Sequence, residues 1–278
     1  GESALDAAVS GGNNTAIGHS VLSNLTSGTF NVGLGARALV NHTTGAQNTA
    51  VGYAALEQQT TASLNTAMGF GALRNTTANN NTAVGHNSLL LNTSGGANTA
   101  IGSAALDANT TASLNTAVGA SSLSSNTTGT RNVAVGANSL DANTTASDNT
   151  AVGQVTLTLN TTGSQNTAVG KGALSANTTA DNNTAVGYHA LDLNTTGTSN
   201  TAVGGFSLDA CTTGADNCAF GINAATDLAT GDNNTCIGHT AGANMVGGSN
   251  NLLLGHDAGT SNSPSGGIVN GSNSVCLG

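Results

Sequence analysis

The chain has 278 residues and a formal net charge of -9, from 13 acidic and four basic side chains. Because four cations can neutralise few phosphates, we expect no nucleic-acid partner. Charged residues make up only 6% of the chain, far below an ordinary domain, yet 37% apolar residues exclude a disordered chain. No apolar run reaches membrane-spanning length, so we expect no membrane insertion. The four cysteines lack metal-ligand spacing, and we predict no metal site and no cofactor.

A segment of the type Asn-Thr-Ala-Val-Gly recurs along the chain. The step between these segments is 17 residues, apart from one step of 16 between Asn65 and Asn81 and a final step of 22. A fixed period of this kind is typical of proteins in which each repeat stacks on the next. The first residue of each segment, which we call the anchor, falls at Asn14, Asn31, Asn48, Asn65, Asn81, Asn98, Asn115, Asn132, Asn149, Asn166, Asn183, Asn200, Asn217, Asn234, Asn251 and Asn273.

The repeats divide the chain into three parts. Residues 1–13 align with the second half of a repeat and are predicted to be a partial entering coil. Residues 14–255 are regular repeats, and residues 256–278 are predicted to be an irregular closing coil in which Pro264 marks a loop. Since both ends lie inside repeats, we interpret the chain as a piece of a longer polypeptide.

Each repeat is predicted to contain two short extended segments and two turns. The Val column, from Ile17 to Leu277, is never polar, and the Thr column accepts Val32 and Leu252, so we expect both columns to face inward. The following Gly predicts a turn with positive φ or a close backbone approach. The second segment carries a Leu column that consists of Leu22, Leu39, Leu56, Leu73, Leu89, Leu106, Leu123, Leu140, Leu157, Leu174, Leu191 and Leu208.

The same pattern fixes the fold class. Asn, Thr and Gly at this density disfavour helices. We therefore predict an all-β fold, a parallel β-solenoid (β-roll) of about 16 coils with a 17-residue repeat.

A further column predicts polar contacts inside the solenoid. The first position of the Asn-Thr-Thr segment accepts Leu25, Leu228 and Met245, which indicates burial. A buried Asn must be hydrogen-bonded, and stacked Asn side chains can bond one another. We predict a structural Asn ladder of Asn75, Asn92, Asn109, Asn126, Asn143, Asn160, Asn177 and Asn194.

Coils that read Asn-Thr-Ala-Val-Gly, two variable residues, Ala-Leu and Asn-Thr-Thr-Gly resemble repeats in long tail-fibre proteins of bacteriophages, notably marine phages and cyanophages. The resemblance covers nearly the whole chain. The coils are also similar to the β-roll repeats in heads of YadA-type trimeric adhesins, which are shorter. Residues 234–238, 241–242, 251–255 and 273–278 look like the stretch that precedes a self-cleaving intramolecular chaperone of the endosialidase type. The resemblance implies that the closing coil leads to this C-terminal domain, which is missing here. The resemblance implies a homotrimer whose assembly that chaperone drives.

The position after the repeat glycine holds the candidate ligand-binding side chains. It varies from Gly205 to Phe70, which is typical of a solvent-facing turn. Aromatic and imidazole faces can stack on sugar rings, although isolated exposed side chains remain the alternative. A metal between the histidines of adjacent coils is possible in principle, but we expect none. The candidates are Tyr53, Phe70, His86, Tyr188, His239 and His256.

No catalytic constellation is visible, and we predict no enzyme activity. Paired-acid hydrolysis needs two carboxyls opposed across a cleft, which a smooth solenoid does not provide. Cys218 and Cys236 fall on opposite faces of neighbouring strands, so we expect no disulfide between them. The carboxylates that follow the Leu column lie on separate coils: Asp107, Asp141, Asp192 and Asp209.

These observations predict a structural and adhesive segment of a phage tail fibre, a homotrimeric rod that attaches the virion to the host cell surface through a receptor polysaccharide. We expect its location to be the virion tail fibre or the cell surface. Its expected partners are itself, through closely approaching Ala columns, a host cell-surface glycan and other virion tail proteins. The alternatives are the head of a bacterial trimeric surface adhesin and an ice-binding solenoid, which the Val and Leu residues in the Thr column disfavour.

Overall fold

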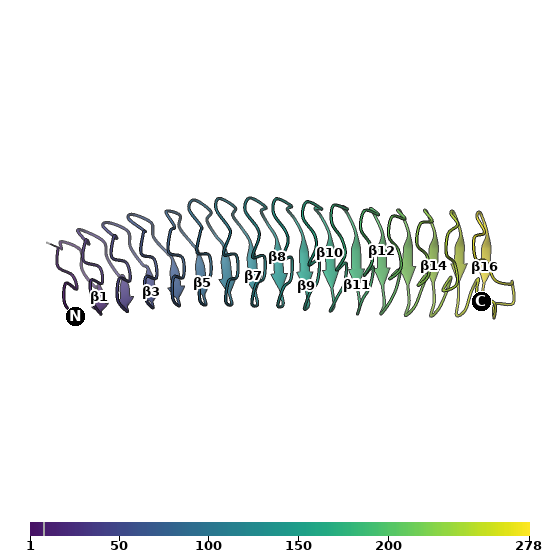
Figure 1. Cartoon of the computed structure of the whole chain (residues 1–278), viewed down its shortest axis with the longest axis horizontal. Coiled ribbons are helices and arrows are strands. Elements are labelled where there is room, and N and C mark those ends of the chain that lie inside the picture. The colour runs from purple at the N-terminus through teal and green to yellow at the C-terminus, as the bar shows by residue number, and fades with distance from the viewer. Residues whose placement is uncertain (8) are drawn as a thin grey trace. The chain divides into compact units, whose positions relative to one another are not determined.

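The computed structural model describes residues 1–7 and 9–278, which divide into two units, Gly1–Ala137 and Asn138–Gly278. Each unit contains eight strands of three residues, one in each coil (Figure 1). The first unit contains β1 (Thr15–Ile17), β2 (Val32–Leu34), β3 (Thr49–Val51), β4 (Thr66–Met68), β5 (Thr82–Val84), β6 (Thr99–Ile101), β7 (Thr116–Val118) and β8 (Val133–Val135). The second contains β9 (Thr150–Val152), β10 (Thr167–Val169), β11 (Thr184–Val186), β12 (Thr201–Val203), β13 (Cys218–Phe220), β14 (Thr235–Ile237), β15 (Leu252–Leu254) and β16 (Val275–Leu277).

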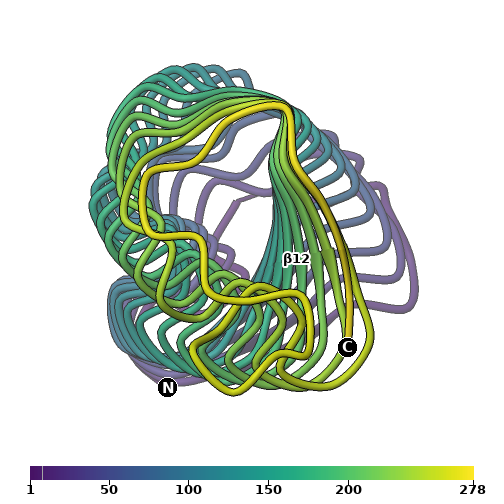
Figure 2. The ribbon, with the colours of Figure 1, turned by 90° about the vertical axis from the view of Figure 1, so that its right-hand side faces the viewer.

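Within each unit, every strand pairs in parallel with the next strand along the chain. Ala100 of β6 lies opposite Ala117 of β7, and Ala168 of β10 lies opposite Ala185 of β11, so equivalent positions of the repeat stand in register. The end-on view shows the strands of the second unit, with β12 labelled, along one side of the coils, and turns forming the other sides (Figure 2). The predicted all-β fold and parallel β-solenoid with a 17-residue repeat are confirmed, and the described residues contain no helix.

The two faces of the strands are the reverse of our expectation. The central Ala of the strand is buried, as Ala100 and Ala185 show, whereas the Thr and Val columns point outward. Ile101 is 41% exposed. Alternation separates a strand's side chains into two sets but does not say which set faces the core. The narrow interior accepts the small Ala side chain at this position, and the larger Val-column side chains lie outside.

The Leu column is buried as a core column should be, but its backbone is not extended. Leu106 and Leu191 are fully buried and have φ of 52°. The second predicted strand is therefore wrong, because these residues lie in consecutive turns. Leu in this left-handed region costs about 1 kcal/mol or more. Hydrogen bonds to both neighbouring coils offset that cost: the Leu191 N–H donates to the Ser207 carbonyl, and the His189 N–H donates to the Lys171 carbonyl, each at 3.0 Å.

The anchor Asn residues form an internal ladder that the sequence analysis did not anticipate. Asn115 shows the pattern: its backbone N–H donates to Oδ1 of Asn98, and its own Oδ1 accepts the N–H of Asn132, both at 2.9 Å. Its Nδ2 donates to the Gly129 carbonyl at 2.9 Å. Asn115 thus joins three successive coils of the first unit and satisfies polar groups that water does not reach.

The predicted Asn ladder runs beside the anchor ladder inside each unit. In the second unit, Nδ2 of Asn177 donates to Oδ1 of Asn160 at 2.8 Å, and Nδ2 of Asn194 donates to Oδ1 of Asn177 at 3.1 Å. Each of these amides also donates to a carbonyl three residues ahead in its own coil. The fully buried members are Asn92, Asn109, Asn126, Asn143, Asn160, Asn177 and Asn194.

Asn75 does not belong to this ladder. It is only half-buried, and Thr76 takes the ladder position, where its Oγ1 accepts the Nδ2 donor of Asn92 at 3.1 Å. The ladder residue follows the buried Leu by three positions in every coil, whereas Asn75 follows Leu73 by two. The 16-residue step omits a residue between Thr76 and Asn81, so both ladders keep their stacking.

The last anchor also shifts by one residue. The backbone N–H of Ser274 donates to Oδ1 of Asn251 at 2.9 Å, so Ser274 takes the position that we assigned to Asn273. Asn273 is exposed with φ of 56°, which is the conformation of the residue before an anchor elsewhere. The final step is therefore 23 residues. The additional residues lie in the irregular segment around Pro264, which is exposed.

Glycines that follow the strands have positive φ and approach the backbone of the neighbouring coil closely, as predicted. The adjacent residues Gly204 and Gly205 provide a test. Gly204 has φ of 134°, and a β-carbon there would overlap the Gly221 carbonyl, whereas a β-carbon at Gly205 would have Tyr188 O, at 3.8 Å, as its nearest neighbour. We expect Gly204→Ala to lower the free energy of unfolding by about 2 kcal/mol or more, because strain and overlap add. Gly205→Ala should change it by less than about 0.5 kcal/mol. Equal denaturant midpoints for the two variants would contradict this.

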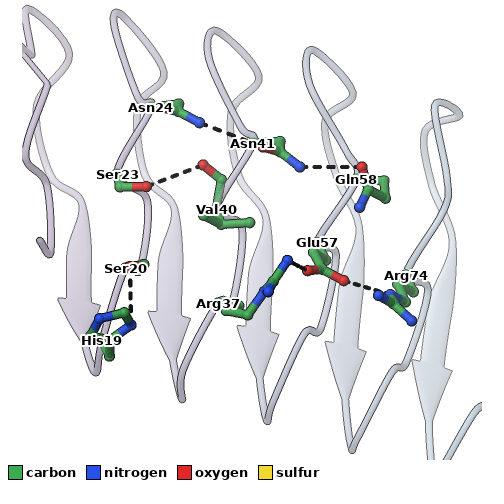
Figure 3. Close-up of polar contacts among 10 residues, drawn as sticks. All are labelled: His19, Ser20, Ser23, Asn24, Arg37, Val40, Asn41, Glu57, Gln58 and Arg74. Carbon is green, nitrogen blue, oxygen red and sulfur yellow. Dashed lines mark hydrogen bonds and ion pairs between the residues drawn. The ribbon is translucent and has the colours of Figure 1, made fainter.

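The anchor ladder gives a second prediction. Asn115→Ala would leave the buried Asn132 N–H without its Oδ1 acceptor, while the Gly129 carbonyl would keep the Nδ2 donor of Asn126. We expect the free energy of unfolding to fall by about 1–3 kcal/mol, which is the usual cost of one unsatisfied buried group. The exposed Asn24, whose side chain points along the outer surface (Figure 3), serves as the control, and Asn24→Ala should be nearly neutral. Thermal or guanidinium unfolding measures both, and comparable losses would refute the role of the ladder.

Candidate functional site

The outer side of the strands forms a surface, here called the strand face, that consists of the Thr and Val columns. In the second unit it includes Thr184 and Val186 of β11 and Cys218 and Phe220 of β13, and Phe220 is 56% exposed. The strand face carries no charged side chain at these columns. Val133 and Leu252 interrupt its Thr column, so the hydroxyl array that ice binding would require is not continuous. An exposed apolar surface of this kind is typical of an interaction site.

Tyr53, Phe70 and His86 lie together in the first unit, at the turn that follows the strands. Their ring planes are nearly parallel, with centroids 5.2 Å apart for Tyr53 and Phe70 and 5.4 Å apart for Phe70 and His86. Phe70 therefore has a neighbouring ring on each face, although it is 53% exposed. The three candidates are brought together as predicted, and the stacking covers both faces of the Phe70 ring.

His239 and His256 form a similar pair in the second unit. Their rings stack with centroids 5.1 Å apart, and both are exposed. Nδ1 of His256 lies 3.1 Å from the Asp257 carboxylate. The described part of the chain contains no group of three or more His, Cys, Asp or Glu side chains that could hold a metal ion.

Tyr188 lies in a different kind of group, here called the Tyr188 cluster: Lys171, Tyr188, His189 and Phe206. The Tyr188 ring is nearly perpendicular to those of His189 and Phe206, with centroids 4.3 Å and 5.2 Å away. Nζ of Lys171, from the preceding coil, lies over the Tyr188 ring at 6.0 Å from its centroid. The sequence analysis named only Tyr188, because His189 and Phe206 fall one position later in the repeat.

Glycine and a carboxylate position the His189 ring. A β-carbon at Gly172 would lie 2.7 Å from Cε1 of His189, so only glycine leaves room for the ring there. Nδ1 of His189 lies 2.6 Å from Oδ2 of Asp192, whose Oδ1 accepts the Ser175 hydroxyl. The arrangement joins two successive coils through side chains and holds the imidazole beside Phe206, parallel to it with centroids 5.9 Å apart.

The neighbouring carboxylates are occupied as well. Oδ1 of Asp209 accepts the hydroxyl of Thr226 at 3.0 Å. Burial raises the pKa of the Asp209 carboxyl, and the Thr226 hydrogen bond partly opposes that rise. Asp192 and Asp209 stand on adjacent coils without forming a cleft, and the described residues enclose no pocket.

The first unit contains a buried charge that the sequence analysis did not identify. Glu57 is fully buried, and its two carboxylate oxygens contact Arg37 from the preceding coil and Arg74 from the following coil (Figure 3). A buried carboxylate requires such partners. Both guanidinium groups are about half exposed, but they are engaged by Glu57 and are not available as a free cationic site.

The four cysteines are free thiols. Burial raises the pKa of Cys211 to about 11 and that of Cys236 to about 12, so both stay protonated at neutral pH. Cys218 points to the strand face while Cys236 points inward, as the alternation predicted. The buried thiols act as small core side chains rather than nucleophiles.

Comparison of the chain with protein-family models, curated proteins and solved structures finds no match. Among the described residues, no helix is long and apolar enough to cross a membrane.

His42 is a buried titratable group in the inner ladder position. Its Nε2 donates to the Gly45 carbonyl at 2.9 Å, and its Nδ1 has no partner among the described residues. Burial lowers the pKa of His42, and the Gly45 hydrogen bond only partly opposes this. The folded chain therefore holds a neutral imidazole at a pH where the unfolded chain already binds a proton.

This difference makes stability depend on pH. With a folded pKa below the unfolded value of 6.5, the contribution of His42 is present above that value and is lost as the pH falls through and below it. For one group the loss is at most about 1.4 kcal/mol per pH unit. His42→Asn, which restores the residue common at this position, should flatten the decline in melting temperature between about pH 7 and 5. The exposed His86→Asn is the control, and identical pH profiles for wild type and His42→Asn would disprove the assignment.

Proposed function

We propose that this chain is a structural and adhesive fibre segment, a stretch of phage tail fibre that presents a binding surface to a host cell. The observation that carries the proposal is the in-register stacking of coils inside each unit, with hydrogen bonds from strands, turns and two Asn ladders. Such stacking gives a stiff element that resists proteolysis. The absence of a pocket and of a metal-ligand cluster in the described residues agrees with a binding role.

The proposed partner in assembly is a second and third copy of the chain, in a homotrimer. The Ala columns cannot form that contact, because they face the interior. The strand face replaces them in the proposal. Its Val column is apolar, neither of its two columns is charged, and its strands are in register, so burying it would remove side chains such as Ile237, which is 42% exposed, from water. Other virion tail proteins and a host glycan complete the proposed set of partners.

Light scattering after size-exclusion chromatography tests this assembly. The wild-type chain should elute as three copies, and a mass of one chain, 26.7 kDa, would overturn the trimer. Val186→Glu, on the strand face, should give monomers because it would bury a charge. Leu193→Glu, at an apolar position outside the strands that is 52% exposed, should leave the trimer intact. In the wild type, Cys218 should react with a maleimide only slowly, and rapid labelling would mean that the strand face is open.

A further inference from the structure

We propose that the Tyr188 cluster binds a glycan that contains carboxylated pyranose sugars, such as hexuronates. The sugar ring packs against Tyr188 and Phe206, and the sugar carboxylate pairs with Lys171. This inference rests on the proposed attachment function and specifies the ligand class of that function.

The aromatic surface of the cluster is open to a ligand. Tyr188 is 49% exposed and Phe206 is 40% exposed. On the coil after Tyr188, the corresponding position is Gly205, which has no side chain, and a β-carbon there would meet only Tyr188 O, at 3.8 Å. Tyr188 therefore has no ring from the same position of the next coil stacked on it, whereas Phe70 has a parallel ring on each face. An amphipathic ring presented in this way suits the apolar face of a pyranose.

The rings are also held in place before a ligand arrives. Gly172 makes room for His189, Asp192 fixes the imidazole through Nδ1, and the imidazole lies against Phe206 and Tyr188. The stacked coils beneath supply a rigid backbone. A preorganised surface loses little side-chain entropy on binding, which favours recognition by a small contact area.

The charge of the cluster selects the ligand. The chain has only four Lys and Arg residues, and two of them, Arg37 and Arg74, engage Glu57. The Lys171 ammonium has no carboxylate within ion-pair distance in the described part of the chain, and its contact is with the Tyr188 ring. The nearby carboxylates of Asp192 and Asp209 already accept hydrogen bonds from Ser175, His189 and Thr226. The Lys171 ammonium, which lies beside the Tyr188 ring, is therefore the charged group of the cluster that can pair with a ligand.

The chain has a net charge of -9, so general electrostatic attraction of a polyanion to it is unfavourable. Binding of a polyanion would therefore indicate a specific site. Affinity electrophoresis of the full chain through gels that contain polygalacturonate measures binding, and fully methyl-esterified polygalacturonate is the uncharged probe with the same rings and linkages. We expect retardation by the acid and much weaker retardation by the ester. Lys171→Gln should lower affinity for the acid about tenfold or more, and Lys171→Arg should restore it to within about threefold.

Alanine variants of the aromatic residues test the contacts between the rings and the sugar. Tyr188→Ala and Phe206→Ala should each lower affinity about tenfold, whereas Phe30→Ala, at an exposed aromatic residue of the first unit that is not a candidate ligand contact, should leave it unchanged. Circular dichroism and melting temperatures establish that each variant is folded, which outward-facing positions permit.

The outcomes separate this inference from the proposed function. Wild-type binding that Lys171→Gln and Tyr188→Ala leave unaltered would overturn the site but retain glycan attachment. Equal binding to acid and ester would overturn the carboxylate requirement. If the wild type binds neither probe but does bind neutral polysaccharides, the ligand class is wrong and attachment stands. If it binds no polysaccharide and no intact bacterial cells, attachment itself fails.

Discussion

The hydrogen bonds between successive coils are the interaction on which the rest of the structure depends. A coil of 17 residues closes only a few turn hydrogen bonds within itself, so its other polar backbone groups need the neighbouring coil. The anchor Asn makes this dependence explicit, since Asn115 bonds Asn98 on one side and Asn132 on the other. A buried polar group left unpaired costs more than a formed hydrogen bond contributes. Register is therefore held firmly at the anchors, and length varies only in the turns between them.

This constraint explains how the chain tolerates irregular repeats. The 16-residue step omits a residue between Thr76 and Asn81, and Thr76 replaces the ladder amide with a hydroxyl that still accepts from Asn92. The final step of 23 residues places its extra length in an exposed segment, and Ser274 still donates to Asn251. The backbone N–H at the anchor, of Asn81 in the first case and of Ser274 in the second, still donates to the side chain of the preceding anchor.

The narrow interior also decides where the functional side chains can be. Ala, Leu, Ser and Asn fill most of it, and the Phe and Tyr side chains are all exposed outside it. At the turn after the strand, the arrangement of rings depends on the neighbouring coils. Tyr53, Phe70 and His86 follow one another and stack in parallel, whereas Gly205 interrupts the column after Tyr188, and Gly172 gives His189 its place. Small residues on adjacent coils thus control which ring surfaces are available.

The sequence by itself determined the period, the parallel solenoid, the glycine turns, the buried Leu column and most of the inner Asn ladder, because stacking repeats equivalent residues in one column. Only the tertiary structure decided which face of the strand is inside. The alternation of side chains is compatible with either face, and the width of the interior selects the one that carries Ala. The positive φ of Leu191 and the bonding of the anchor Asn also required the structure, because both arise from contacts with neighbouring coils. The Tyr188 cluster could not be read from one column, since Lys171, Tyr188 and Phe206 belong to three coils and two positions of the repeat and meet only when the coils are stacked.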